Sequence, residues 1–587
     1  MYDIKISGGT LVDGTGAERF TGDLGIKDGV IVAVGDECTE SAEKTIDASG
    51  AIVTPGFCDI HTHYDGQVSW DADLAPSSIH GVTTCAMGSC GVGFAPVRPT
   101  DHERLIELME GVEDIPGTAL AEGITWGWET FPQYMDALAQ MPHAIDYLCH
   151  VPHDALRVYV MGERAVAEED ATDADIAEMR RLLRLALEAG AVGFSTGRSD
   201  NHRSAKGEWT PASEATGKEL AGVAEAFVGL KHGVLQAVSD FDILHGDDRF
   251  EGEFALLEGM LKAAGGRPMS ISTMQRDHSA NQWKWIFAEA EKLNQQGYDV
   301  RCQVAPRGIG VILGLTATFH PLMGFPSYKK ISHLPLKERV AAMRDPELRA
   351  RMIQEKSEPV AGDGSPLPPL ADFFLANLDM VAMRLFRLGE EPDYEPTVQQ
   401  SFAAEAMRRK EAVLGVIYDA LLENDGEALL YFPVYNYAGM NLDVCHQMLT
   451  HPLALPGLSD GGAHVGTICD ANFPTFMMTH WARDRQMARI PLETIIKMQA
   501  HDTARFIGLT DRGTLAKGQR ADINIIDFEK LRLKHPVMQQ DLPAGGQRLM
   551  QYAEGYVATL VAGTTIAENG RLTGAHPGHL VRAGRPC

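Results

Sequence analysis

The stretch PGFCDIHTHYDG, residues 55–66, places two histidines one residue apart at the end of a short apolar run. In an extended strand, residues i and i+2 point to the same side, so the rings of His61 and His63 can face one point. Two imidazoles that face one point can bind a metal ion. An isolated HxH pair is also common among histidines with a purely structural role, so the rest of the chain has to decide.

The composition is that of a large globular protein. Of the 587 residues, 44% are hydrophobic and 22% are charged, and no run approaches the roughly 20 apolar residues that span a bilayer. The start, MYDIKISGGTLVDG, has no basic segment followed by an apolar one, so no secretory signal is predicted. Nine cysteines without a CxxC pair do not form a disulfide framework. We therefore expect a cytoplasmic protein with reduced thiols.

The formal net charge of −28 limits the partners of the protein. Such a charge repels nucleic-acid phosphates and acidic membrane surfaces, and the sequence contains no concentrated basic patch that would overcome it. We expect a small-molecule substrate, no nucleic-acid partner and no membrane partner. The sequence leaves a homo-oligomer open.

Short strand-like segments with glycine turns occupy both ends of the chain. Residues 1–53 contain IKISGGTLVDG and DLGIKDGVIVAVG, and residues 506–587 contain RADINIIDF and YVATLVAGTTIAENGRL. The two ends are predicted to build one small β-domain.

Between these ends, in residues 54–505, apolar runs alternate with charged, helix-like segments such as DADIAEMRRLLRLALEAG. This alternation is typical of a parallel α/β sheet. With the run before His61 there are close to eight apolar runs, and ALLYFPV at 428–434 is the doubtful member. An α/β fold with a TIM-type (β/α)8 barrel fits best, and a doubly wound sheet is the second choice.

Residues from about 320 to 420 interrupt the barrel rhythm. They carry the helix-like LPLKERVAAMRDPELRARMIQEK and the Pro/Gly-rich PVAGDGSPLPP, and they are too long for an ordinary loop. Because insertions after barrel strands lie over the mouth of the active site, we expect this segment to be a lid.

Cys90 and Asp460 are further candidates for a metal site. Cys90 follows the second predicted strand in AMGSCGVG, where flanking glycines let a thiolate approach a metal. Asp460 ends the last predicted strand in GLSDGGAH. Taken alone, the first is equally well a small buried hydrophobe and the second a turn aspartate. Together with His61 and His63 they suit a metal that activates water, with Asp460 as the base, so hydrolytic chemistry is predicted.

Several motifs resemble the amidohydrolase superfamily and, within it, the N-acyl-D-amino-acid deacylases (D-aminoacylases). They are SGGTLVDGTG, IVTPGFCDIHTH, the SCG turn, EAGAVGFSTG, LSDGGAH and GTLAKGQRADINIID. The resemblance implies a zinc-bearing β/α barrel, a small β-sandwich made from both termini, and a lid inserted in the barrel. It also implies that His61, His63, Cys90 and Asp460 occupy the metal and catalytic positions.

The chain departs from that family at the fifth and sixth strands, where the deacylases carry two further zinc-binding histidines. Here GVLQAVSDFD and RPMSISTMQRD offer no good zinc ligand at the corresponding places, which are Val238, Ser239, Thr273 and Met274. We therefore expect one zinc ion per chain. The alternative is a second ion held by a histidine that replaces a missing ligand: His153, His202 or His278.

The family's lysine after the sixth strand and its arginine beyond the aspartate are also missing, so the substrate pocket has changed. Arg307 is a candidate replacement, since a guanidinium binds a carboxylate in a fork, although a solvated loop arginine is the simpler interpretation. His153 and His202 are predicted to line the pocket. His464 is predicted to orient Asp460 or to contact the substrate.

Three functions remain after these comparisons. The first is a zinc hydrolase of a linear amide, an N-acyl D-amino acid or a related N-acyl compound, and it is the one we predict. The second is a cyclic amidase of the hydantoinase or dihydroorotase type, which needs a carboxylated lysine at the end of the fourth strand, where this chain reads AVGFSTGR. The third is a non-catalytic scaffold, against which the retained His61, His63 and Asp460 argue.

Overall fold

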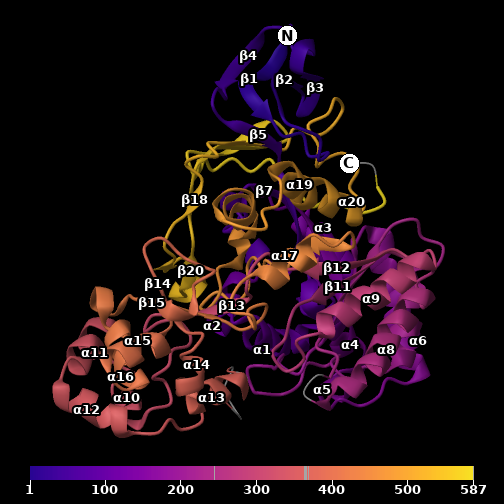
Figure 1. Cartoon of the computed structure of the whole chain (residues 1–587). Helices are drawn as coiled ribbons and strands as arrows, with labels where there is room; N and C mark the ends of the chain where they lie inside the picture. The colour runs from indigo at the N-terminus through magenta and orange to yellow at the C-terminus, as the bar shows by residue number, and fades with distance from the viewer. Residues whose placement is uncertain (243–244, 362–366, 368, 586–587) are drawn as a thin grey trace.

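The computed structural model describes residues 1–242, 245–361, 367 and 369–585. Figure 1 shows three parts: a β-domain at the top, a barrel in the centre and a helical lobe at the lower left. None of the helices in the described part of the chain has the length and apolar character of a membrane span.

Eight parallel strands form the central barrel, and a parallel bridge from Thr62 to Gly461 joins its first strand to the segment after its last. The predicted TIM-type barrel is confirmed. In order around the sheet the strands are β6 (Phe57–Thr62), β7 (Val82–Met87), β8 (Asp146–Pro152), β9 (Gly193–Arg198), β10 (Val234–Ser239), β11 (Met269–Thr273), β12 (Val300–Val304) and β16 (Ala454–Pro456).

The doubtful run ALLYFPV does not belong to the barrel. It forms β15 (Leu429–Pro433), which pairs antiparallel with β13 (Gly310–Leu313) and β14 (Phe386–Leu388). An apolar run shows that a segment is buried but not which sheet it joins, and here it pairs within the insertion.

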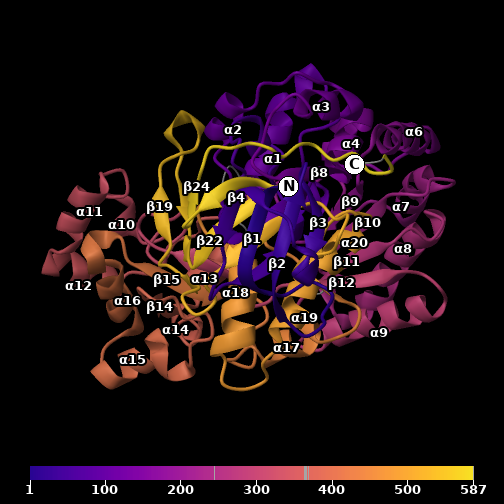
Figure 2. The same ribbon diagram turned by 90° about the horizontal axis from the view of Figure 1, so that it is seen from above.

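Amphipathic helices cover the outside of the barrel on the side opposite the lobe (Figures 1 and 2). The longest, α6 (Asp173–Ala189), begins at a capping box between Thr172 and Asp175 and ends at Gly190, whose φ is +111°. Its inward face is apolar at helical spacing. The other helices on this side are α4 (His153–Met161), α7 (Gly217–Ala224), α8 (Phe250–Ala263) and α9 (Gln282–Gln295).

The β-domain joins the two ends of the chain in one nine-stranded sheet, as predicted. Strand β5 (Ile52–Pro55) pairs antiparallel with β17 (Ile523–Ile526), and N- and C-terminal strands lie side by side in Figure 2. The remaining strands of this sheet are β1 (Tyr2–Leu11), β2 (Phe20–Lys27), β3 (Val30–Val34), β4 (Ala42–Asp47), β22 (Tyr556–Val561), β23 (Thr564–Glu568) and β24 (Arg571–Leu572).

The lobe at the lower left of Figure 1 is the insertion between β12 and β16. It contains the β13–β15–β14 sheet and its own hydrophobic core. Most of the Pro/Gly-rich stretch, residues 362–366 and 368, lies outside the described residues. The helices of the lobe are α10 (Pro326–Lys329), α11 (Leu336–Met343), α12 (Pro346–Gln354), α13 (Pro369–Ala376), α14 (Leu378–Val381), α15 (Phe402–Arg409) and α16 (Val413–Leu421).

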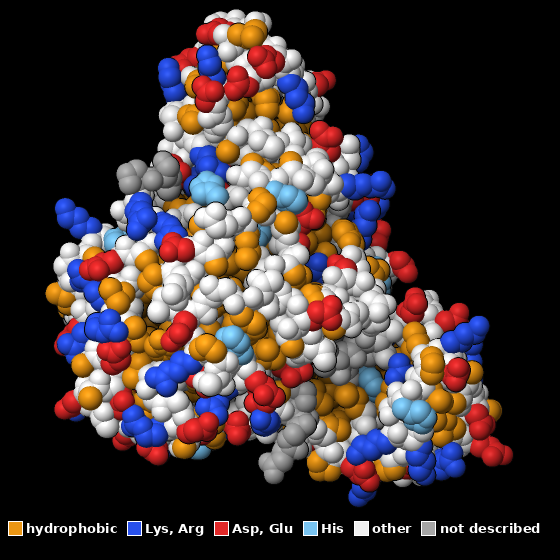
Figure 3. All heavy atoms as spheres, turned by 180° about the vertical axis from the view of Figure 1, so that it is seen from behind, with side chains coloured by type: hydrophobic (Ala, Val, Ile, Leu, Met, Phe, Trp, Pro, Cys, Tyr) orange, Lys and Arg blue, Asp and Glu red, His pale blue; other side chains and the backbone are white. Residues whose placement is uncertain are grey.

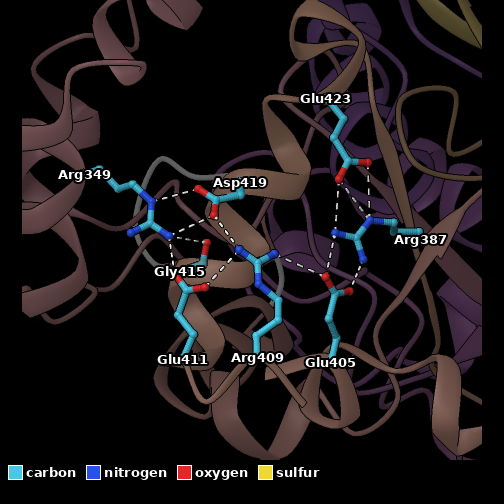
Figure 4. A network of polar contacts seen from close by, with 8 residues as sticks. All are labelled: Arg349, Arg387, Glu405, Arg409, Glu411, Gly415, Asp419 and Glu423. Atoms are coloured by element: carbon cyan, nitrogen blue, oxygen red, sulfur yellow. Dashed lines mark hydrogen bonds and ion pairs between the residues drawn. The ribbon is translucent and has the colours of Figure 1, made fainter. Parts of the chain in front are cut away.

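A network of ion pairs joins the helices of the lobe (Figure 4). Arg349 of α12 forms a two-pronged pair with Asp419 of α16, at 2.8 and 2.9 Å, and Arg409 of α15 reaches the same carboxylate at 3.1 Å. These side chains are about one-third exposed, so each pair contributes little. The network fixes how the helices are oriented, while the apolar core supplies most of the stability.

A buried ion pair joins the barrel to the β-domain. The guanidinium of Arg512 donates to Asp146 at the start of β8, at 2.7 Å, and lies 3.8 Å from Asp522 just before β17. All three side chains are almost fully buried. Burial opposes the charge of Arg512, but the two carboxylates keep its pKa well above the usual range.

Replacing Arg512 is expected to weaken the attachment of the β-domain to the barrel. Arg512→Ala leaves Asp146 and Asp522 with Arg520 alone, which pairs with them at 3.1 and 3.0 Å, and is expected to cost about 3 kcal/mol of stability, measured as a lower urea midpoint. The matched control is Arg532→Ala, which removes an exposed pair with Glu554 and is expected to change stability by less than about 1 kcal/mol. Equal effects of both variants would contradict this account.

Candidate active site

A cavity of about 310 Å³ opens at the carboxyl ends of the barrel strands. Its floor contains His61, His63, Cys90 and Asp460, and the insertion supplies one of its walls. This is the end of a barrel at which catalytic groups gather, because eight strand ends and their loops converge there.

The two histidines of the opening stretch lie together at the end of β6. Their ring centroids are 5.5 Å apart, and both side chains are buried. His61 Nδ1 lies 2.7 Å from Oε1 of Gln303 on β12, which orients the ring so that Nε2 faces Cys90 Sγ at 3.3 Å. The orientation of His61 is therefore set from across the barrel.

Cys90 reaches this point because of the turn that carries it. Its φ is +56°, a conformation in which a side chain is strained. A Cβ at Gly88 would lie 2.7 Å from the His150 carbonyl oxygen, and one at Gly91 would lie 2.7 Å from the Gly197 nitrogen. The Cys90 amide donates to Gln236 Oε1 at 3.1 Å. Two glycines and one glutamine thus hold the thiol against the histidines.

Asp460 faces the same histidines from the other end of the chain. Its Oδ1 lies 3.4 Å from His61 Nε2 and 3.7 Å from His63 Nε2, and its φ is +49°. Burial would raise the pKa of this carboxyl, but His63, His61 and His464 hold it well below its usual range. The aspartate is therefore ionised and beside the point on which the histidines converge.

These residues suit a metal ion. The donor atoms of His61, His63 and Cys90 all lie within 4.8 Å of one another. The ring of His63 is buried, and within the described part of the chain its two nitrogens face the carboxyl groups of Glu113 and Asp460 without a well-formed hydrogen bond to either. Burial, followed by the charges of Glu113 and Asp460, raises the pKa of the Cys90 thiol well above its ordinary value, so a thiolate requires a cation beside it.

The sequence analysis missed Glu113, at the end of α1 (His102–Glu113). Its buried carboxyl lies between two histidines, with Oε1 3.2 Å from His63 Nδ1 and Oε2 3.4 Å from His464 Nε2. The backbone amide of His464 also donates to the backbone carbonyl oxygen of Glu113. A carboxylate on the far nitrogen of a ligand histidine fixes the ring and increases its basicity. The only signal for Glu113 in the sequence is its position at the end of a helical segment, in GVEDIPG.

Two of the other predicted pocket residues line the cavity. His464 lies at its edge beside Glu113, and the partly buried His202, which follows β9, also lines it. Burial, then the neighbouring His464 and His63, lowers the pKa of His202 to about 4, so this ring is neutral. His202 is not one of the three clustered donors.

His153 and Arg307 do not line the cavity, so their predicted contact with substrate is corrected here. Both nitrogens of His153 are occupied, one by Thr196 Oγ1 at 2.9 Å and one by Glu219 Oε1 at 3.0 Å. Arg307 pairs with Asp470 at 2.7 Å, with its guanidinium 3.5 Å from the Tyr394 ring centroid. A guanidinium that is held in this way supports the barrel wall and is not available to a ligand.

Another arginine, which the sequence analysis did not single out, does face the cavity. Arg276 follows β11 and is 5% exposed. It donates to Gln282 Oε1 and to the Ser239 carbonyl oxygen, both at 2.8 Å, so two of its five N–H groups are used on neutral acceptors. Within the described residues no carboxylate lies within ion-pair distance of it, and the charge of Asp240, which also lines the cavity, acts on it from farther away.

Comparison with known proteins agrees with this geometry. The sequence profile described as Amidohydrolase family matches residues 44–567, and the chain belongs to that family. It is 27% identical to a D-aminoacylase of Alcaligenes xylosoxydans xylosoxydans over 99% of this chain and 97% of that one. An N-acyl-D-aspartate deacylase of the same organism is 36% identical over 227 residues, which are 39% of this chain and 41% of the relative.

Solved structures show the same fold. A D-aminoacylase structure superposes with a TM-score of 0.63 at 22% identity, covering 99% of this chain and all of the other. The N-acyl-D-glutamate deacylase of Bordetella bronchiseptica, solved with zinc and a phosphonate inhibitor, gives 0.61 at the same identity and coverage. The predicted resemblance to the D-aminoacylases is confirmed, and the protein is a hydrolase of carbon–nitrogen bonds other than peptide bonds.

The Glu113 carboxylate is expected to strengthen metal binding without being a ligand. Glu113→Gln should weaken the affinity for zinc about 10- to 100-fold, measured by competition with a chromogenic chelator, because the amide supports the His63 ring less well. The control is Glu110→Gln, one turn earlier on α1, whose Oε1 accepts from the Gly117 amide at 2.9 Å. Equal zinc affinity of the Glu113 variant and the native protein would show that the contact is only structural.

Proposed function

We propose that this protein is a zinc-dependent hydrolase of N-acyl D-amino acids, acting on the linear amide bond. The observation that carries the proposal is the convergence of His61, His63 and Cys90 with the ionised Asp460 on a cavity that also contains a guanidinium without an ion-pair partner among the described residues. The full-length similarity to a D-aminoacylase supports the substrate class.

The zinc ligands in this proposal are His61, His63 and Cys90, with Asp460 adjacent. Bound zinc would polarise the scissile carbonyl and acidify the attacking water. One zinc per chain is proposed, because the fifth and sixth strands end in Val238, Ser239, Thr273 and Met274. The other group of three donors in the described residues, Asp200, Asp240 and Asp242, consists of carboxylates alone, which suit harder cations.

Asp460 serves as the general base and then as the general acid. Its carboxylate takes a proton from the attacking water and returns it to the nitrogen of the leaving amine, so one residue completes both transfers. Glu113 holds the His63 ring in place during these steps, and Gln303 holds His61. The buried floor keeps bulk water away from the reacting atoms.

Arg276 provides the contact that selects an amino acid. Its unused N–H groups form part of a planar fork, and such a fork binds a carboxylate through two parallel hydrogen bonds. A guanidinium that is buried without an ion-pair partner carries a desolvation cost in the free protein. An anionic ligand that pairs with it offsets this cost. This residue takes the role that the sequence analysis had considered for Arg307.

The two alternatives have less support. A cyclic amidase of the hydantoinase type needs a carboxylated lysine at the end of the fourth strand, but β9 ends at Arg198, which pairs with Glu253 at 3.0 Å. A non-catalytic scaffold does not require an ionised aspartate beside two buried histidines, so this arrangement argues against that function. Hydrolysis of an N-acyl amino acid uses all of these groups.

Removing the base tests the mechanism. Asp460→Asn keeps the size of the side chain but cannot accept the proton, so turnover of an N-acetyl D-amino acid by the zinc-loaded enzyme should fall at least ~10²-fold. The variant should still bind one equivalent of zinc and melt cooperatively. The Arg532→Ala variant, altered at an exposed residue outside the cavity, should keep its activity. Turnover by Asp460→Asn close to that of the native enzyme would exclude the proposed role.

Arg276 is expected to recognise the carboxylate of the substrate. Arg276→Gln should lower kcat/KM for an N-acetyl D-amino acid about 10- to 100-fold, the value of one or two charge-assisted hydrogen bonds. The same variant should act normally on the matching N-acetyl amine, which has no carboxylate. Arg276→Lys should restore only part of the loss, because an ammonium forms no fork. Equal losses on both substrates would mean that Arg276 supports the fold only.

A further inference from the structure

The wall that the insertion adds to the cavity is apolar. Next to it, the barrel side offers His202, Asp240 and Arg276, whereas the insertion side consists almost entirely of hydrocarbon and aromatic surface. The residues that form this apolar wall are Val311, Phe319, Leu370, Phe374 and Phe432. A cavity with one charged side and one long apolar side suits an amphiphilic ligand.

The apolar wall is longer than one amino-acid side chain requires. The ring of Phe374 lies 5.4 Å from that of Phe319 and 5.1 Å from that of Phe432, both measured between centroids, so three rings follow one another along the wall. The rings meet edge to face, which is a stable arrangement, and all three belong to the cavity lining. An extended chain can contact all three of them.

The wall also reaches the surface of the protein. Leu370 lines the cavity and is 37% exposed. Phe373 of α13, Met380 of α14 and Met383 in the turn after α14 are between 50% and 54% exposed. In Figure 3, orange side chains lie where the lobe at the lower right meets the barrel. Exposed apolar surface that continues a cavity is typical of a ligand-binding groove.

The position of Arg276 decides which part of the substrate follows this wall. Tyr435 stands between the two sides, with its ring centroid 5.9 Å from the Arg276 guanidinium carbon, and it also lines the cavity. In an N-acyl amino acid, the side chain and the carboxylate branch from one carbon, so the side chain stays near Arg276. The acyl group lies beyond the scissile carbonyl and is the part that can lengthen along the wall.

We propose that the acyl group of the substrate is a linear hydrocarbon chain long enough to contact all three rings, and that it lies along the apolar wall of the insertion. This inference rests on the proposed function, since it takes Arg276 as the carboxylate anchor. In the reaction, water supplies a hydroxyl to the acyl carbon as the C–N bond breaks. The products are a fatty carboxylic acid, which ionises, and a free amino acid, whose nitrogen receives the proton.

The test compares N-acetyl, N-hexanoyl and N-decanoyl derivatives of one D-amino acid below their micellar concentrations. With the zinc-loaded enzyme, kcat/KM should rise about two- to fourfold for each added methylene until the wall is covered. Phe374→Ala should lower the decanoyl-to-acetyl ratio at least ~10-fold. Leu370→Ser, at a partly exposed position that tolerates substitution, should lower it severalfold. Met407→Ala, at an exposed apolar position of α15 that does not line the cavity, should leave it unchanged.

Binding measured by calorimetry with the Asp460→Asn variant separates this inference from the proposed function. Hydrolysis of the acetyl compound with no gain in rate or affinity for the decanoyl compound would overturn the inference and leave the function standing. Tight, Phe374-dependent binding of the decanoyl compound without hydrolysis by the native enzyme would support the ligand class and overturn the function. Neither binding nor hydrolysis would overturn both.

Discussion

The site depends on how the first and last barrel strands meet. At this seam the His63 amide donates to the Gly461 carbonyl oxygen at 2.8 Å, and Ser459 Oγ donates to Asp59 Oδ2 at 2.5 Å and to the His61 carbonyl oxygen at 3.1 Å. These bonds hold segments almost 400 positions apart in one register. Because of them, an aspartate that ends the last strand faces histidines that end the first. Without closure of the barrel, Asp460 would not reach the donors that follow the first two strands.

Polar side chains from other strands hold that donor set in place. Gln303 orients His61 from the seventh strand, Gln236 holds the Cys90 amide from the fifth, and Glu113 supports His63 from a helix after the second. A buried polar group is stable only when it has a polar partner. Each of these contacts therefore restricts the conformation of the metal-site residue that it touches. Two of these three supporting groups are uncharged amides, which hold the cluster in place without adding charge to it.

The insertion has two separate tasks. Its own core and ion-pair network allow it to fold as a unit beside the barrel. Its inner surface forms an apolar wall of the cavity, whereas the metal-site residues all belong to barrel strands and loops. This division lets the wall vary without any change in the positions of His61, His63 or Asp460, which agrees with a family in which one catalytic floor serves different substrates.

The sequence by itself determined the barrel, the β-domain from both termini and the residues at strand ends, because strand periodicity and short motifs are local properties of the chain. It did not determine that ALLYFPV joins the insertion, that Arg307 pairs with Asp470, or that Arg276 faces the cavity. Those outcomes depend on which side chains from distant segments meet. Only the tertiary structure decided them, since the partner of a buried charge is chosen by packing and not by its neighbours in the chain.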